Sequence, residues 1–158
     1  MGMLSVVVRR NLDPTLAMLR EVVVDCPDVL WMSPATGIRQ HVYHIMVGMD
    51  IWLSPDPGAY PFDEIVESDA AEFGAPLSDR ISRAFLLAYL ERLEARIAAL
   101  PGDDAAYLDE VTLRGRRFTF LDRCLGQLRH AQHHIGVINE RLYREAEHEV
   151  DWQGYGEG

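Results

Sequence analysis

The sequence predicts an all-α protein, a four-helix bundle that forms a single domain over residues 1–158. Four stretches of the chain carry apolar residues at helical spacing, and segments rich in proline and glycine separate them. The chain shows neither an internal repeat nor a ladder of alternating strands. Hydrophobic residues make up 48% of its 158 residues, which is enough for one globular core. Four helices of this kind pack as a bundle.

The first two helices are predicted from the residues that start and stop them. Asp13 and Pro14 begin the first helix, because a capping side chain followed by a proline favours initiation. This helix ends before Cys26. The second helix covers residues 38–53, between a Thr-Gly pair and a Ser-Pro pair. Because apolar side chains cover most of its circumference, we expect the second helix to lie at the centre of the protein.

A long loop and a third helix come next. Residues 55–77 contain four prolines and two glycines, which predicts a loop of about twenty residues. A connection this long inside a compact domain is usually functional or crosses between distant elements. The third helix is expected to begin after Ser78 or Ser82 and to run to about Leu100, where a Pro-Gly pair ends it.

The last helix is the longest. Residues 101–117 are expected to be irregular, with one short β-like run at residues 111–113 and a group of arginines after it. We interpret these arginines, Arg114, Arg116 and Arg117, as part of a solvated loop; the alternative is that they contact an anionic cosubstrate. Thr119 can cap a fourth helix that extends to about Glu145.

Five of the six histidines lie in two of the predicted helices. His130 and His134 are four residues apart and flank the face of the fourth helix that points to the core, whereas His133 leans toward solvent. His41 and His44 both lie on the apolar side of the second helix. Neutral imidazoles gathered in a bundle core need a shared partner, and a divalent cation is the natural one. The alternative is that they bond to the backbone or to water, and spacing alone does not choose between His41 and His44 as the third ligand.

Several other classes of protein are disfavoured by composition and motifs. The net charge of −10 argues against nucleic acid as a partner. No apolar run approaches the length of a membrane span, and the N-terminus lacks the pattern of a secretory signal, so a cytoplasmic protein is expected. The chain has no lysine, which excludes Schiff-base chemistry. The zinc-protease motif HExxH is absent, and ExxH occurs once, whereas a di-iron bundle needs two copies.

The two cysteines have no metal-binding or redox spacing. Cys26 and Cys124 stand alone in the sequence, which fits a reducing compartment. We interpret both as small buried residues rather than nucleophiles.

Four segments resemble a known family. Residues 43–54, with the ending Asp-Ile-Trp-Leu-Ser, are similar to the second helix of DinB-like (YfiT-like) proteins. Residues 129–136, Arg-His-Ala-Gln-His-His-Ile-Gly, resemble the fourth-helix signature of that family. Residues 26–31 match the turn after its first helix, and residues 86–90 its third helix. The resemblance therefore extends over nearly the whole chain.

The resemblance implies a fold and a metal site. The family fold is a four-helix bundle in up-down-down-up order, which requires a long crossover between helices two and three. A divalent metal, zinc or nickel, is held there by one histidine of helix two and the HxxxH pair of helix four. Carried over, the ligands are His44, His130 and His134, with water completing the coordination. His41 departs from the family pattern and is expected to be a fourth ligand or to line the pocket.

The implied activity is that of a metal-dependent enzyme. Relatives with an assigned reaction use low-molecular-weight thiols, bacillithiol or mycothiol, so a thiol S-transferase acting on a small molecule is the first hypothesis. A metal-dependent hydrolase and a non-catalytic, stress-related metal-binding or interaction protein are the alternatives. No residue stands out as catalytic, and Asp50 is interpreted as a helix-end or loop-anchoring group. A homodimer is compatible with a bundle whose second helix is almost entirely apolar.

Overall fold

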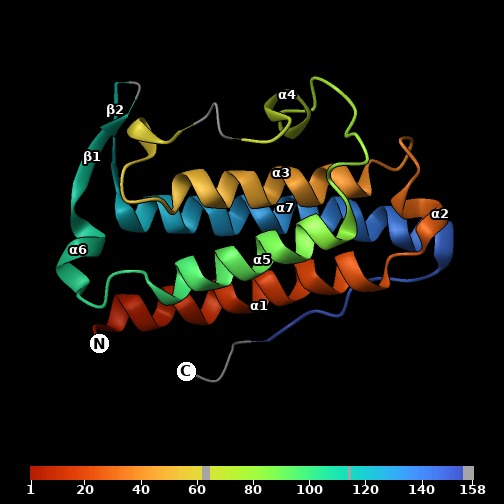
Figure 1. Ribbon diagram of the computed structural model, residues 1–158. Coiled ribbons are helices and arrows are strands. Elements are labelled where there is room, and N and C mark those ends of the chain that lie inside the picture. Colours follow the sequence, from red (N-terminus) through yellow and green to blue (C-terminus); the bar gives the residue numbers. More distant parts are fainter. Residues whose placement is uncertain (62–64, 114, 155–158) are drawn as a thin grey trace.

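The protein is mostly helical in the computed structural model, which describes residues 1–61, 65–113 and 115–154. Within these ranges it has seven α-helices, one short 3-10 turn and one sheet of two strands. Four long helices lie alongside one another (Figure 1): α1 (Met3–Asp25), α3 (Ile38–Trp52), α5 (Arg83–Ala98) and α7 (Phe120–Ala146). The smaller elements are α2 (Asp28–Trp31), the 3-10 turn (Pro57–Ala59), α4 (Ser68–Ala71), α6 (Asp104–Leu108), β1 (Glu110–Leu113) and β2 (Arg116–Thr119).

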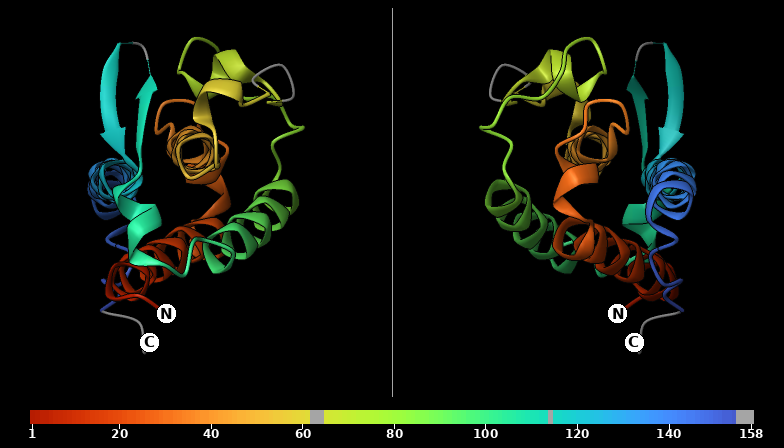
Figure 2. Two further views of the ribbon diagram at one scale, coloured as in Figure 1. Left: turned by 90° about the vertical axis from the view of Figure 1, so that its left-hand side faces the viewer. Right: turned by 90° about the vertical axis from the view of Figure 1, so that its right-hand side faces the viewer.

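The core lies between the four long helices. Helix α1 packs on α5 and α7, and α3 packs on α7 and α5. The end-on views of Figure 2 show the two strands standing beside α7, and the segment with the 3-10 turn and α4 beside α3. As expected for a central helix, most of α3 is buried. None of the helices in the described ranges combines the length and apolar character that crossing a membrane needs.

Three of the four predicted helices have the expected bounds. Helix α3 follows Gly37, and α5 is capped by Ser82, whose hydroxyl accepts a hydrogen bond from the Phe85 amide at 3.2 Å. Helix α7 begins with a capping box, in which Thr119 and Asp122 bond to each other's backbone amides. These start signals are local, and the sequence therefore located them.

The predicted start of the first helix was wrong. Helix α1 begins at Met3 and carries Pro14 in its interior. The carboxylate of Asp104 in α6 accepts hydrogen bonds from the backbone amides of Met3 and Leu4, at 3.0 and 2.7 Å. This cap lies about 100 residues away in the sequence. The cap stabilises the first turns of α1, for which the neighbouring sequence contains no helix-start signal.

The β-like run predicted at residues 111–113 is confirmed as β1, but the expectation of otherwise irregular structure without a strand ladder before the last helix was wrong. Strands β1 and β2 pair antiparallel, with Val111 opposite Phe118. Gly115, in the turn between them, has a φ of +75°, which glycine adopts at little cost. The hairpin packs on α3 through Phe118, whose ring centroid lies 6.0 Å from that of Trp52. The hairpin thus gains support from a helix far away in sequence. Arg114 lies outside the described residues.

The segment predicted as a long loop contains two short helical turns. The 3-10 turn and α4 both lie along α3 (Figure 1), and residues 62–64 lie outside the described ranges. Gln40 of α3 donates hydrogen bonds to the carbonyl oxygens of Ala70 and Ala75, at 2.9 and 2.8 Å. Tyr43 also donates to the Val66 carbonyl. These bonds hold the crossover, residues 55–77, against α3.

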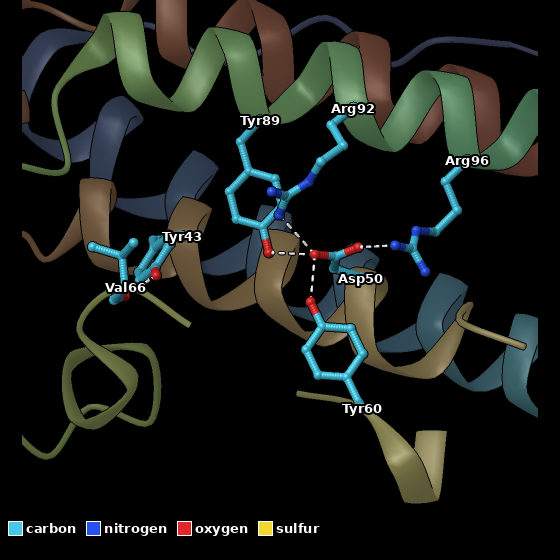
Figure 3. Close-up of polar contacts among 7 residues, drawn as sticks. All are labelled: Tyr43, Asp50, Tyr60, Val66, Tyr89, Arg92 and Arg96. Carbon is cyan, nitrogen blue, oxygen red and sulfur yellow. Dashed lines mark hydrogen bonds and ion pairs between the residues drawn. The ribbon is translucent and has the colours of Figure 1, made fainter. Parts of the chain in front are cut away.

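A buried carboxylate joins α3 to both α5 and the crossover. Asp50 is 1% exposed, and its Oδ2 accepts hydrogen bonds from Tyr60 at 2.6 Å and Tyr89 at 3.0 Å (Figure 3). Arg92 lies 2.7 Å from the same oxygen, and Arg96 lies 2.9 Å from Oδ1. Because Tyr60 belongs to the crossover, the interpretation of Asp50 as a loop-anchoring group is confirmed.

We expect the substitution Asp50→Ala to lower the free energy of unfolding by about 3 kcal/mol, because it leaves two arginines and two tyrosine hydroxyls without their shared acceptor. Urea unfolding followed by circular dichroism measures the change. The substitution Glu91→Ala, at an exposed position of α5, is the control and should change stability by less than about 0.5 kcal/mol. Equal stability losses in the two variants would contradict the role given to Asp50.

Candidate metal centre

Three histidines from two helices converge at the contact between α3 and α7. His130 and His134 lie one turn apart on α7, and His44 faces them from α3. Nε2 of His44 is 2.8 Å from Nε2 of His130. The ring centroids of every pair among the three are 4.7 Å apart. One ring nitrogen from each histidine lies within 4.8 Å of those from the other two, so the group can hold a metal ion.

The hydrogen bond made by His44 indicates which of its ring nitrogens is free to bind a cation. Nδ1 of His44 lies 2.6 Å from the carbonyl oxygen of Ala71, which only accepts hydrogen bonds, so Nδ1 carries the proton and Nε2 a lone pair. That lone pair points toward Nε2 of His130, and a proton or a cation is needed between the two nitrogens. Nitrogens that share an ion at about 2.1 Å lie about 3.0 Å apart around an octahedral ion and about 3.4 Å apart around a tetrahedral one, so an ion would move these two rings slightly apart. Imidazole nitrogen suits zinc, nickel, copper and iron alike, so the donor set fits a divalent transition metal.

Burial keeps the rings of His130 and His134 neutral. Together with the neighbouring histidines, it lowers the pKa of His130 to about 4 and that of His134 to about 3. Burial and the charge of Arg141 lower the pKa of His41 to about 4. Imidazoles with such pKa values are unprotonated at neutral pH, which is the form that binds metal.

The structure separates the other two histidines from this group. His133 is exposed, as the helical geometry predicted. His41 is buried, and its Nδ1 lies 2.9 Å from Nδ1 of His134. That contact leaves Nε2 of His134 for an ion and places His41 beside a candidate ligand, outside the group of three. The structure thus pairs His44 with the two histidines of α7.

Phe73, which the sequence analysis missed, covers the histidines from the crossover. Its ring centroid lies 4.7 Å from that of His44, 4.9 Å from His41 and 6.1 Å from His134. Its backbone has a φ of +59°, an uncommon and strained conformation for a bulky residue. No local pattern marks this phenylalanine, because its place over the site depends on how the crossover folds back onto α3.

A cavity of about 650 Å³ opens beside His44 and His130. Its wall includes Gly48, and a Cβ atom there would lie 3.1 Å from Oε1 of Gln127 and 3.2 Å from Cε1 of His130. A side chain at Gly48 would therefore crowd the histidine group. The missing side chain keeps space open for a small molecule next to the candidate metal ligands.

The two cysteines do not take part in the site. Cys26 and Cys124 are both buried, which confirms this part of their interpretation. Burial raises the pKa of the Cys26 thiol to about 11 and that of Cys124 to about 12. Neither thiol forms a thiolate at neutral pH, so neither acts as a nucleophile in this state.

Comparisons of this chain with protein-family models, with curated proteins and with solved structures find no match. The function is therefore argued from the site.

We expect one divalent ion per chain, and we expect the substitutions His44→Ala, His130→Ala and His134→Ala each to abolish stoichiometric binding, because two imidazoles hold an ion far more weakly than three. Elemental analysis and zinc titration calorimetry measure the stoichiometry and the affinity. The control, His133→Ala, removes the exposed neighbour on the same helix and should leave both unchanged. Full occupancy after loss of any of the three histidines would refute the site.

His41 should act on affinity rather than on stoichiometry. If it accepts a hydrogen bond from His134 and thereby orients that ring, His41→Leu should keep one ion per chain and weaken binding about 10- to 100-fold. Competition with a chromogenic chelator separates the two cases. Loss of the ion itself in this variant would instead identify His41 as a ligand.

Proposed function

We propose that this protein is a divalent-metal-dependent enzyme of the DinB-like type. We propose further that it is an S-transferase, which joins a low-molecular-weight thiol through its sulfur to a small electrophile. The observation that carries the proposal is the convergence of His44, His130 and His134 beside an open cavity. Three protein nitrogens leave coordination positions for a ligand, as in catalytic sites rather than in closed structural ones. Zinc and nickel are the proposed ions.

The course of the chain supports the family assignment. In Figure 1 the colours advance in one direction along α1 and α7 and in the opposite direction along α3 and α5. This agrees with the up-down-down-up bundle that the resemblance implies. The crossover between α3 and α5 also has the place that such an order requires.

An ion at this site supplies Lewis acidity, which lowers the pKa of a thiol or a water molecule that it binds. In S-transfer a thiol loses its proton, its sulfur forms a bond to an electrophilic carbon, and the leaving group departs with the bonding electrons. Soft sulfur is a preferred ligand of zinc, which favours a thiol over water. This difference supports transfer over hydrolysis.

The chain itself orients the ligands and shields them. The Ala71 carbonyl fixes the ring of His44, and His41 does the same for His134. Phe73 lies over the rings and limits access of water from the side of the crossover. Substrate therefore enters from the cavity between α3 and α7.

The test is a transfer assay with zinc- or nickel-loaded protein, glutathione, cysteine or another small thiol, and 1-chloro-2,4-dinitrobenzene as the electrophile. We expect thioether formation above the uncatalysed rate, and we expect chelation of the metal or His130→Ala to lower the rate at least about 100-fold. Absorbance of the dinitrophenyl thioether measures the rate. His133→Ala is the control and should retain full activity.

Two results would contradict the proposal in different ways. Metal-loaded protein that turns over no thiol in the panel, and no ester or amide either, would be a non-catalytic metal-binding protein. Hydrolysis without S-transfer would identify a metal-dependent hydrolase.

A further inference from the structure

Three buried polar atoms along α7 have no hydrogen-bond partner in the part of the chain that the structure describes. They are Nε of Arg123, Oε1 of Gln127 and Nδ1 of His130. Spacings of four and three residues place the three side chains on one face of the helix. All three residues line the cavity of about 650 Å³ beside the histidines. Buried polar groups normally have partners. Of the seven buried side-chain atoms without a partner in the described residues, these three belong to residues that line this cavity, which makes it the candidate place for a ligand.

Arg123 is the charged member of this set. It is 5% exposed, and its Nη1 donates a hydrogen bond to the Ser54 carbonyl at 3.0 Å. Its guanidinium carbon lies 4.7 Å from the centroid of the Phe120 ring. Among the described ion pairs none includes Arg123, whereas Arg92 and Arg96 share the carboxylate of Asp50. The charge of Asp56 acts on Arg123 from beyond ion-pair distance. A buried guanidinium that contacts no counter-ion is costly, and an anionic ligand would supply one.

The geometry favours a carboxylate as the anion. A single unpaired positive charge matches a single negative charge, and the planar guanidinium matches the two oxygens of a carboxylate. The amide NH2 of Gln127, one turn further along α7, can donate a hydrogen bond to a carboxylate oxygen, whereas its Oε1 only accepts. His130 lies seven residues from Arg123, about 10 Å along the helix axis. A ligand of several bonds can therefore reach from the arginine to the histidine nitrogens.

We propose that the cavity between α3 and α7 is a carboxylate subsite, in which Arg123 and Gln127 bind the carboxylate of a small thiol whose sulfur lies at the histidine group. The place of the sulfur rests on the proposed function. The place of the carboxylate rests on the buried and unpaired Arg123 alone.

A second cavity allows the subsite to be located. Arg123 also borders a space of about 780 Å³ that includes Arg92 and Arg96 and none of the histidines. Gly48 lines the first cavity and not the second. The substitution Gly48→Leu therefore fills the histidine side and leaves the other side open.

The first experiment uses metal-free protein and two probes of equal length, hexanoate and hexanamide, in titration calorimetry. We expect hexanoate to bind at least about tenfold more tightly to the wild-type protein. The substitution Arg123→Gln should bring the ratio of the two affinities close to one, and Gly48→Leu should abolish binding of hexanoate. The matched control is Arg129→Gln, at an exposed arginine on the rim of the same cavity, which should change the ratio less than about threefold.

Three results would overturn the carboxylate subsite. The first is equal affinity of the wild-type protein for hexanoate and hexanamide, which decides the question whether or not the Arg123→Gln variant folds. The second is a preference for hexanoate that survives Arg123→Gln, because the charge then plays no part. The third, hexanoate binding that survives Gly48→Leu, would place the anion in the second cavity.

The second experiment tests whether one ligand reaches both Arg123 and the histidine group. Cobalt-loaded protein is titrated with 6-mercaptohexanoate and with 6-mercaptohexanol, and the visible absorption of cobalt reports sulfur coordination. We expect both thiols to change the spectrum and the carboxylate to bind about tenfold more tightly. Equal affinities would overturn a ligand that spans the cavity. If cobalt does not bind, the metal-dependent function fails, and the hexanoate titration still decides the carboxylate subsite.

Discussion

The buried carboxylate of Asp50 joins three parts of the molecule, and the candidate site depends on all of them. It fixes α3 against α5 through Arg92 and Arg96, and it holds Tyr60 at the start of the crossover. The same crossover returns along α3 to His44, which lies six residues from Asp50, or about 9 Å along the helix. There it places the Ala71 carbonyl on one imidazole and an aromatic ring over the group. The wall of the site is therefore anchored at a distance from it.

The arginines that line the two cavities differ in whether they form ion pairs. Two arginines of α5 form ion pairs with a buried acid, whereas Arg123 of α7 contacts a carbonyl oxygen and an aromatic face and forms none of the described ion pairs. Arg123 lines the same cavity as Gln127 and His130, whose Oε1 and Nδ1 have no partner in the described residues. Buried polar groups that lack hydrogen-bond partners are expected mainly at functional or ligand-binding sites. Three of the seven buried atoms without a partner in the described residues lie on α7 at its contact with α3, where Gly48 leaves room for a ligand.

Local signals accounted for most of the helical fold. The caps at Ser82 and Thr119 act within one helical turn, so the starts of α5 and α7 were predictable. The start of α1 was not, because its cap is supplied by Asp104, about 100 residues further along the chain. The hairpin escaped prediction for a similar reason, since Phe118 finds its support on Trp52 of α3. Long-range contacts decide such elements, and no window of sequence contains them.

The candidate site divides in the same way. The sequence alone determined that His130 and His134 form a pair and that His133 points away, because rotation along a helix is a local and regular property. Only the tertiary structure decided that His44 meets this pair while His41 lies beside His134. It also decided that Phe73 covers the rings and that Arg123 stays unpaired. These facts depend on how α3, α7 and the crossover pack, and packing joins side chains from segments that are dozens of residues apart.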